Sequence, residues 1–259
     1  MTKEKVALVT GAGSGIGKAA AIALARDGYA IGALGRTASE LDELVAEIQS
    51  HGGKAKALVA DVADADQMTH ATEQLIEAFD RVDVVVANAG INGVWAPIED
   101  LTPEEWDNTI TVNLRGTYLT LNKTVPHLKA AGGGSIIIVS SINGTRTFTS
   151  PGATAYSATK AGQLAMAQQL ALELGQYKIR VNAICPGAIE TKIDDNTHIR
   201  SSHETAVPVE WPEGDIPITG GEAGLSEDVA DLVVFLAGDK SRHITGTPVW
   251  IDGGQGLLR

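Results

Sequence analysis

Cysteine is nearly absent from this sequence, which contains only Cys185 among its 259 residues. A single cysteine cannot form an intrachain disulfide, so a secreted, disulfide-stapled scaffold is excluded. Long apolar runs are missing as well. The run that begins at Val6 is shorter than the apolar region of a signal peptide or a membrane span, and we expect neither. The sequence therefore predicts a cytoplasmic protein without a membrane partner, in which Cys185 is a buried, unreactive thiol.

Positive charge is in short supply, because 20 Lys and Arg residues oppose 32 Asp and Glu residues and leave a net charge of −12. Phosphate backbones recruit basic surfaces, so we expect no nucleic-acid partner. Aromatic residues make up only 4% of the chain, whereas glycine occurs 29 times, so tight turns and close backbone approaches matter more than ring packing. With 44% apolar and 20% charged residues, the composition is that of a globular protein.

Short apolar runs alternate with segments of helical periodicity along almost the whole chain. Most runs have no polar alternation, which is typical of parallel strands that helices cover on both faces. We therefore predict a single doubly wound, Rossmann-type α/β domain over residues 1–259, with about seven parallel strands. The expected strands are 6–10, 30–34, 55–59, 82–87, 135–140, 180–184 and 248–251. The expected helices are at about 15–27, 39–51, 65–79, 103–131, 155–175 and 226–238.

Two of these helices begin with a capping signal. Asp64 precedes Gln67, and Thr102 precedes Glu105, in the spacing of a capping box, with Pro103 at the first helical position. Both signals predict helix starts at these positions.

The segment 189–224 interrupts the alternation and is rich in proline and glycine. Connections longer than about 12–15 residues are uncommon in compact domains unless they are lids or linkers. We predict a substrate lid that includes a short helix.

A glycine-rich turn, Thr10 to Gly17, follows the first expected strand and opens the first expected helix. The strict G-x-G-x-x-G pattern fails, because Ile16 stands where the third glycine would be needed. What remains is G-x-x-x-G-x-G, formed by Gly11, Gly15 and Gly17 with Ser14 and Ile16 between them. An isolated glycine cluster is also compatible with a flexible turn. Its place between strand and helix favours a dinucleotide, whose pyrophosphate would meet the helix N-terminus.

The residue after the second expected strand bears on the choice of dinucleotide. An acidic residue at this distance from the glycine turn would bind the adenosine ribose of NAD, but the chain has Arg36 there. A guanidinium can form two charge-assisted hydrogen bonds with a 2′-phosphate. Arg36 therefore favours NADP(H). NAD(H) is the alternative if Arg36 is only a solvated surface charge.

A phenol and an ammonium, Tyr156 and Lys160, are four residues apart in an expected helix and can face one site. Such a pair also arises by chance as an exposed helical pair. Here further polar groups follow neighbouring strands, where ligands of doubly wound folds bind. Asn88 with Ala89 and Gly90 closes the fourth expected strand, and Ser140 with Ser141 closes the fifth. Asn113, within 112–116, is a further polar candidate.

In combination these motifs resemble the short-chain dehydrogenase/reductase family in its compact form, and the resemblance extends through Asp252 near the end of the chain. The resemblance implies a catalytic tetrad of Asn113, Ser141, Tyr156 and Lys160. It also implies a set of cofactor contacts. These are Asp61 and Val62 at the adenine, Asn88, Ala89 and Gly90 at the ribose, and Pro186, Gly187, Ile189 and Thr191 at the nicotinamide.

One spacing departs from the family pattern. Ser141 lies fifteen positions before Tyr156, two more than usual, so Asn143 is a rival that keeps the usual distance. We retain Ser141 because it ends the strand and carries a hydroxyl group.

Reduction of a ketone needs a hydride from the cofactor and a proton, for which Tyr156 is the candidate acid. Lowering a phenol pKa from about 10 by 2–3 units takes roughly 3–4 kcal/mol. One cation about 4 Å away contributes on the order of 4 kcal/mol at an effective dielectric constant near 20, so Lys160 is expected to lower the pKa of Tyr156. The resemblance further implies that Lys160 binds the nicotinamide ribose, that Ser141 holds the substrate oxygen and that Asn113 anchors a water.

The expected substrate is a small carbonyl or alcohol compound. Segment 189–224 contains eight carboxylates and two cations, a net charge of −6, which opposes docking of an acidic acyl carrier protein. The same run could serve solubility alone. Expected apolar walls of the substrate site are Trp95, Phe148 and Trp211.

The leading hypothesis is thus an NADP(H)-dependent oxidoreductase that acts on CH–OH or C=O groups. Alternatives are an NAD-dependent alcohol, polyol or sugar dehydrogenase, a 3-oxoacyl reductase, or a cofactor-sensing protein without turnover, which the presence of both Tyr156 and Lys160 disfavours. The six histidines show no ligand spacing, so we expect no metal. The helix that begins near Ala155 is apolar around much of its circumference, which predicts self-association. The family resemblance implies a homodimer or homotetramer.

Overall fold

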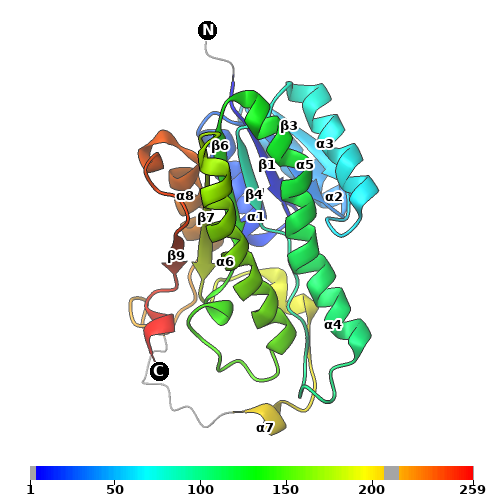
Figure 1. Cartoon of the computed structure of the whole chain (residues 1–259), viewed down its shortest axis with the longest axis vertical. Coiled ribbons are helices and arrows are strands. Elements are labelled where there is room, and N and C mark those ends of the chain that lie inside the picture. The colour runs from blue at the N-terminus through cyan, green and yellow to red at the C-terminus, as the bar shows by residue number, and fades with distance from the viewer. Residues whose placement is uncertain (1–3, 207–215, 259) are drawn as a thin grey trace.

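The computed structural model describes residues 4–206 and 216–258, and it confirms the doubly wound α/β fold (Figure 1). Seven parallel strands form one sheet in the order β3-β2-β1-β4-β6-β7-β9. The order reverses between β1 and β4, and ligands of open α/β sheets bind at the carboxyl ends of the strands beside such a reversal. The strands are β1 (Val6–Thr10), β2 (Ala30–Gly35), β3 (Ala55–Val59), β4 (Val84–Ala87), β6 (Gly134–Val139), β7 (Ile179–Pro186) and β9 (Pro248–Ile251).

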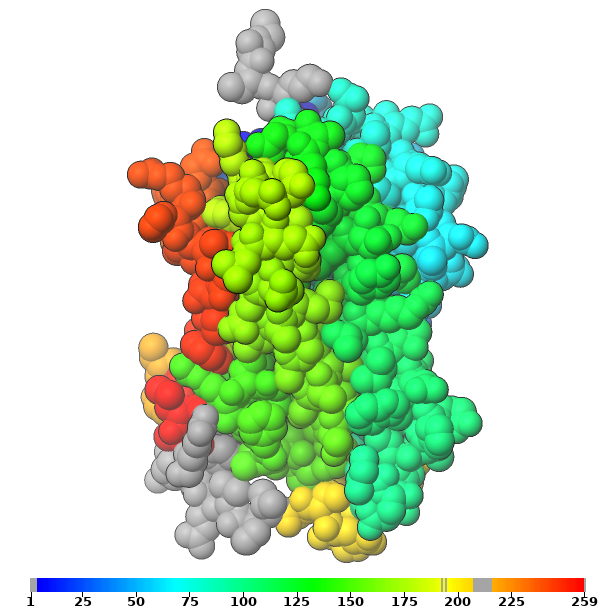
Figure 2. All heavy atoms as spheres, in the orientation of Figure 1, coloured from blue at the N-terminus to red at the C-terminus, as the bar shows by residue number. Residues whose placement is uncertain are grey.

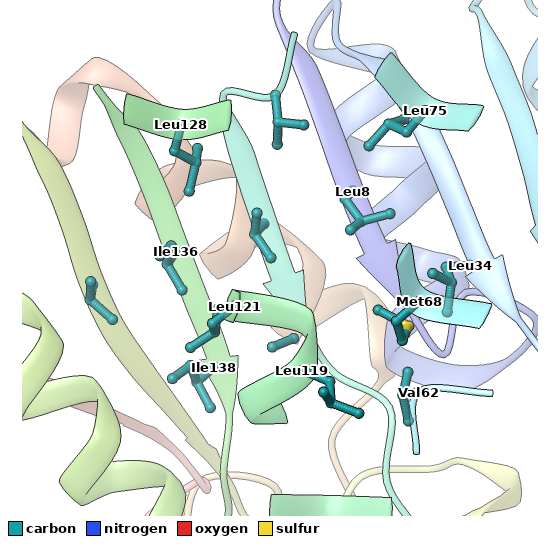
Figure 3. Packing of buried hydrophobic residues seen from close by; sticks show 14 of the residues in the cluster. Leu8, Leu34, Val62, Met68, Leu75, Leu119, Leu121, Leu128, Ile136 and Ile138 are labelled. Carbon is teal, nitrogen blue, oxygen red and sulfur yellow. The ribbon is translucent and has the colours of Figure 1, made fainter. Parts of the chain in front are cut away.

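Helices cover both faces of the sheet, as the continuous apolar strands predict. Successive residues of β1 point to opposite faces, so Leu8 joins one buried cluster while Ala7 and Val9 join the other. Figure 3 shows the cluster of Leu8, which packs strands against leucines such as Leu121 and Leu128. One face carries α3 (Ala65–Phe79), α5 (Gly116–Ala131) and α6 (Thr154–Gly175). The other carries α1 (Gly15–Arg26), α2 (Ala38–Ser50) and α8 (Ser226–Ala237).

The long helix expected at 103–131 is interrupted. It consists of α4 (Pro103–Ile110), a π-helical turn (Thr111–Arg115) and α5. The turn contains Asn113, and single-turn π-helices frequently mark functional sites. Hydrophobic periodicity cannot indicate this interruption, because α4 and α5 run in the same direction and have similar patterns of apolar residues.

The two capping predictions fared differently. At α4 the Thr102 hydroxyl accepts from the Glu105 N–H and the Glu105 carboxylate accepts from the Thr102 N–H, so the box is complete. At α3 the Asp64 carboxylate accepts from the N–H of Gln67, which confirms the helix start. A full capping box would also need a hydrogen bond from the Asp64 N–H to the Gln67 side chain. That part of the prediction is wrong, because Gln67 Oε1 accepts from the N–H of Asp61 instead, at 2.9 Å.

A second, two-stranded parallel sheet, which the sequence did not indicate, pairs β5 (Gly93–Trp95) with β8 (Thr197–Ile199). Each strand has three residues, too few for a periodicity signal. The pairing attaches residues from within 189–224 to the body of the protein, and α7 (Ser202–Thr205) follows as the expected short helix. Arg200 adds an ion pair with Glu105, at 2.9 Å to each carboxylate oxygen, which lowers the pKa of Glu105 to about 2.

None of the helices within the described residues combines the length and apolar composition needed to cross a membrane.

Candidate active site

The glycine turn after β1 has a backbone that requires glycine. Gly11 and Gly15 have φ angles of 67° and 51°, in the left-handed region that glycine adopts without a steric penalty because it has no Cβ. A Cβ at Gly17 would lie 2.1 Å from the carbonyl oxygen of Gly11. Helix α1 begins at Gly15, and the Ser14 side chain makes no capping hydrogen bond. The first N–H groups of α1 therefore form the kind of anion site that suits a pyrophosphate.

The ends of β1 and β4 are tied together beside this turn. The Thr10 hydroxyl accepts from the N–H groups of Asn88 and Ala89, at 3.0 and 3.1 Å. Asn88 Nδ2 donates to the carbonyl oxygen of Thr10, also at 3.0 Å. Asn88 thus holds the glycine turn in place as well as lining the cleft.

Two adjoining hollows of about 420 and 630 Å³ open at the carboxyl ends of the strands. The walls of the two have Ile16, Asn88, Gly90, Thr191 and Ile193 in common, so together they form one continuous cleft. The smaller hollow is lined by the predicted residues Gly11, Ser14, Gly15, Ile16, Arg36, Asp61, Val62, Asn88, Ala89, Gly90 and Thr191. The larger is lined by the predicted residues Ser141, Tyr156, Lys160, Pro186, Gly187 and Ile189.

Two predicted residues do not line either hollow. Gly17 is buried and acts through the close packing of α1 against Gly11. Asn113 is fully buried and is enclosed by hydrogen bonds. Its side chain accepts from the Ile91 N–H at 2.8 Å and donates to the Ile91 carbonyl at 2.9 Å and to Thr159 Oγ1 at 3.1 Å.

The carbonyl oxygen of Asn113 also has partners, which bears on its expected role as a water anchor. It accepts from Thr117 Oγ1 at 2.7 Å and from Gln163 Nε2 at 3.0 Å. A carbonyl has two lone pairs, and these two side chains use both. In this structure Asn113 braces the Ile91 backbone against α6, and its carbonyl oxygen already has two side-chain donors.

Tyr156 and Lys160 lie on α6 and face the larger hollow together with Ser141. Tyr156 is buried, and burial raises its pKa to about 12, against the lowering influence of a hydrogen bond with Ser141. Lys160 Nζ lies 5.4 Å from the centre of the Tyr156 ring and donates to the carbonyl oxygen of Val139 at 3.0 Å. Burial lowers the pKa of Lys160 to about 8.

The expectation that Lys160 lowers the pKa of Tyr156 is therefore wrong for this structure. Removal of the phenol from water outweighs other influences on it, and the ammonium is itself destabilised by burial. A phenol with a pKa near 12 is protonated at neutral pH. Tyr156 is thus available as a proton donor, which is the form that reduction of a carbonyl requires.

Ser141 and its rival Asn143 are separated by their contacts. Ser141 lies two residues after the end of β6 and caps a short 3₁₀ turn, where its hydroxyl accepts from the Asn143 N–H at 3.1 Å. The Asn143 side chain turns to Ser150 Oγ, at 3.0 Å. Both residues line the larger hollow, but it is Ser141 that forms the hydrogen bond with Tyr156.

The expected apolar walls are only partly found. Trp95 lines the larger hollow, with its ring centre 6.3 Å from that of Tyr156. Phe148 is 69% exposed and does not line the hollow, so its assignment is wrong. Trp211 lies outside the described residues. The sequence around Phe148 gives no sign of this exposure, because the path of its loop alone turns the ring toward solvent.

Several lining residues were missed, among them Glu40 in the smaller hollow and Asn92, Glu190 and Gln255 in the larger one. Gln255 Oε1 accepts from the Ala188 N–H at 2.9 Å, which brings the end of the chain to the cleft. The spacing of Glu40 four residues after Arg36 was the available signal for its placement. Asn92 and Gln255 carried none, since isolated amides occur on any surface.

Cys185 is buried, as expected, and burial raises its pKa to about 11, so the unreactive thiol form is favoured. Among the described side chains, no group of three or more His, Cys, Asp and Glu residues is arranged to hold a metal ion.

Comparisons with known proteins agree with this geometry. A model of the short chain dehydrogenase family matches residues 5–201. A 3-oxoacyl-[acyl-carrier-protein] reductase from Thermotoga maritima is 39% identical over 250 residues, which cover 96% of this chain and 97% of the relative. The solved structure of a 3-ketoacyl-ACP reductase from Sinorhizobium meliloti is 64% identical and superposes with a TM-score of 0.94 over 98% of this chain and 100% of the other.

A further solved structure shows a nucleotide cofactor. It is a 3-ketoacyl-(acyl-carrier-protein) reductase from Brucella melitensis complexed with NADH, 32% identical, with a TM-score of 0.86 over 98% of this chain and 99% of the other. The match to the family model, over residues 5–201, includes the glycine turn and the Tyr156–Lys160 helix. The chain therefore belongs to the short-chain dehydrogenase/reductase family and is an oxidoreductase that acts on carbonyl or hydroxyl groups with NAD(P)(H).

Proposed function

We propose that the protein reduces a ketone to a secondary alcohol, with Tyr156 as the proton donor. The observation that carries this proposal is that Ser141, Tyr156 and Lys160 meet in a hollow continuous with the cleft of the glycine turn. When bound, reduced NAD(P)H supplies the hydride that adds to the carbonyl carbon. The carbonyl oxygen takes the phenol proton of Tyr156, so that one hydride and one proton complete the alcohol.

The other groups of the site support this transfer. Ser141 is placed to hold the substrate oxygen beside the phenol, because its hydroxyl already bonds to Tyr156. The Lys160 ammonium stabilises the phenolate that remains after proton transfer, although burial opposes its own charge. Asn113 keeps the Ile91 backbone and α6 in register and touches neither hollow.

The fit of a dinucleotide rests on the glycine cradle. A Cβ added at Gly11, Gly15 or Gly17 would come within 3.2 Å of a neighbouring atom. The first turn of α1 faces the smaller hollow. The exposed Arg36 lines the same hollow and favours a 2′-phosphate, so NADPH is the proposed cofactor, with NADH as the alternative.

For the substrate we propose a 3-oxoacyl group, for which the names of the Thermotoga and Sinorhizobium proteins are the support. From the sequence alone, a 3-oxoacyl reductase was one of the alternatives. The sequence identity with these two proteins favours a 3-oxoacyl substrate over an unspecified small ketone. The charge argument remains relevant to delivery. Glu190, Asp195, Glu204 and Glu222 are exposed, and the Glu190 side chain borders the larger hollow. Their charges oppose docking of an acidic carrier protein.

The first experiment replaces Tyr156 by phenylalanine, with Tyr118→Phe as the control because Tyr118 is 52% exposed and outside the cleft. We expect Tyr156→Phe to lose about 10²- to 10⁴-fold in turnover, since it removes the proton donor. Binding of NADPH, followed by its fluorescence, should not change. Turnover within a few-fold of the unmodified protein would refute the role of Tyr156.

A second experiment compares substrates at equal concentration. These are a 3-oxoacyl N-acetylcysteamine thioester, which is uncharged, the same acyl group on a carrier protein, and a simple cyclic ketone. We expect the thioester to exceed the cyclic ketone in kcat/KM and the carrier protein to give no further gain. Greater activity on the cyclic ketone would establish the small-ketone alternative instead.

A further inference from the structure

Glu40 lies where the adenosine end of the cleft meets the glycine turn. It is in the first turn of α2, four residues after Arg36, and both line the smaller hollow together with Gly13. A Cβ built on Gly13 would lie 2.5 Å from Glu40 Oε2. The carboxylate thus occupies the space into which any side chain at position 13 would project, and it faces the backbone of the pyrophosphate turn.

The charges around this part of the hollow are mixed. Arg36 contributes one guanidinium to the lining of the hollow, whereas Glu40, Asp61 and Asp195 contribute three carboxylates. Within the described residues, Glu40 forms no ion pair with a lysine, arginine or histidine. Its negative charge is therefore available to act on whatever occupies the ribose end of the cleft.

We propose that Glu40 is a specificity-determining residue that weakens binding of the NADPH 2′-phosphate and so opposes Arg36. The inference rests on the proposed use of this cleft for NAD(P)H. A 2′-phosphate carries a charge of about −1.5 to −2 near neutral pH, so a carboxylate in the same hollow repels it. The 2′-hydroxyl of NADH has no charge and can donate a hydrogen bond to a carboxylate. Glu40 therefore makes the protein accept NADH more readily than Arg36 alone would allow.

The test uses adenosine fragments, so that it does not depend on turnover. Isothermal titration calorimetry measures the affinity of 2′,5′-ADP and of 5′-AMP for the unmodified protein, Glu40→Gln and Glu40→Asp. Glu43→Gln is the matched control, because Glu43 is exposed on the same helix and does not line the hollow. A charge of about −2 facing a unit charge some 6–7 Å away in water corresponds to about a tenfold effect, which salt screens.

We expect Glu40→Gln to raise the ratio of 2′,5′-ADP affinity to 5′-AMP affinity by about five- to tenfold at low salt, and by less at high salt. Glu40→Asp, which keeps the charge, and Glu43→Gln should change the ratio by less than about twofold. An unchanged ratio in Glu40→Gln, or an equal rise in Glu40→Asp, would overturn the inference. Failure of the unmodified protein to bind either fragment would instead overturn the assignment of the cleft to a dinucleotide, and this inference with it.

Discussion

Replacing Lys160 by methionine removes a buried ammonium while keeping a side chain of similar length. Lys160 is 3% exposed, and burial lowers the pKa of its ammonium from 10.5 to about 8. Between these two pH values the unfolded chain binds more protons at this residue than the folded protein does. Linkage then requires that the free energy of unfolding rises with pH from about 8 to 10.5, and that the folded state is less stable below pH 8 by the cost of the buried charge.

The size of this effect follows from the shift. A change of one pKa unit corresponds to 1.36 kcal/mol, so a shift of about two and a half units corresponds to about 3 kcal/mol over the whole range. The slope is at most about 1.4 kcal/mol per pH unit for a single group. Lys160→Met has no proton to bind, so its stability should lack this contribution while it keeps those of all other groups.

The assay is urea denaturation at several pH values from 7 to about 9.5, below the pKa of about 12 that Tyr156 has in the folded protein. We expect the free energy of unfolding of the unmodified protein to gain about 1–2 kcal/mol relative to Lys160→Met across this range. Lys240→Met is the control for the loss of a lysine side chain, because Lys240 is exposed. Parallel pH curves for the unmodified protein and Lys160→Met would refute the reasoning that burial controls this lysine.

Two further predictions concern the glycine turn and the surface. Gly17→Ala should lose about 1–3 kcal/mol of unfolding free energy and bind nucleotide more weakly, because its Cβ would lie 2.1 Å from the Gly11 carbonyl oxygen. Gly175→Ala, with open space around its Cβ, should be neutral or stabilising in the same urea assay. Helices α5 and α6 lie uncovered on one face in Figure 2, and Leu172 of α6 is 84% exposed. We expect a dimer or tetramer in sedimentation, weakened by Leu172→Glu, and a monomer at micromolar concentration would contradict this expectation.

The central strands of the large sheet could be predicted because both of their faces are buried. A strand such as β4, Val84–Ala87, is a continuous apolar run, and the sequence itself therefore marks it. The glycine turn and the pair of Tyr156 and Lys160 could be predicted for a different reason. Backbone freedom at glycine and the spacing of four residues on a helix are local properties, which do not depend on the rest of the fold.

The remaining features of the site depend on contacts between distant segments. The raised pKa of Tyr156 comes from burial, which no property of positions 156–160 indicates. The bonds of Asn113 to Ile91 and Gln163 join the π-helical turn to the loop after β4 and to α6. The contact of Glu40 with Gly13 likewise arises because α2 packs beside the glycine turn. The residue types therefore indicate which groups could take part in chemistry. The packing determines how each group is ionised and which groups already have hydrogen-bond partners.

The position of Gln255 has a practical consequence for how the protein is handled. Its side chain borders the larger hollow and bonds to the Ala188 N–H, while the carboxylate of nearby Asp252 accepts from the N–H groups of Gly254 and Gly256. The amino end of β1, by contrast, lies at the opposite edge of the sheet (Figure 1). An affinity tag or immobilisation linker fused after residue 259 would crowd the larger hollow, where we propose that substrate binds, whereas one fused before residue 1 would lie away from it.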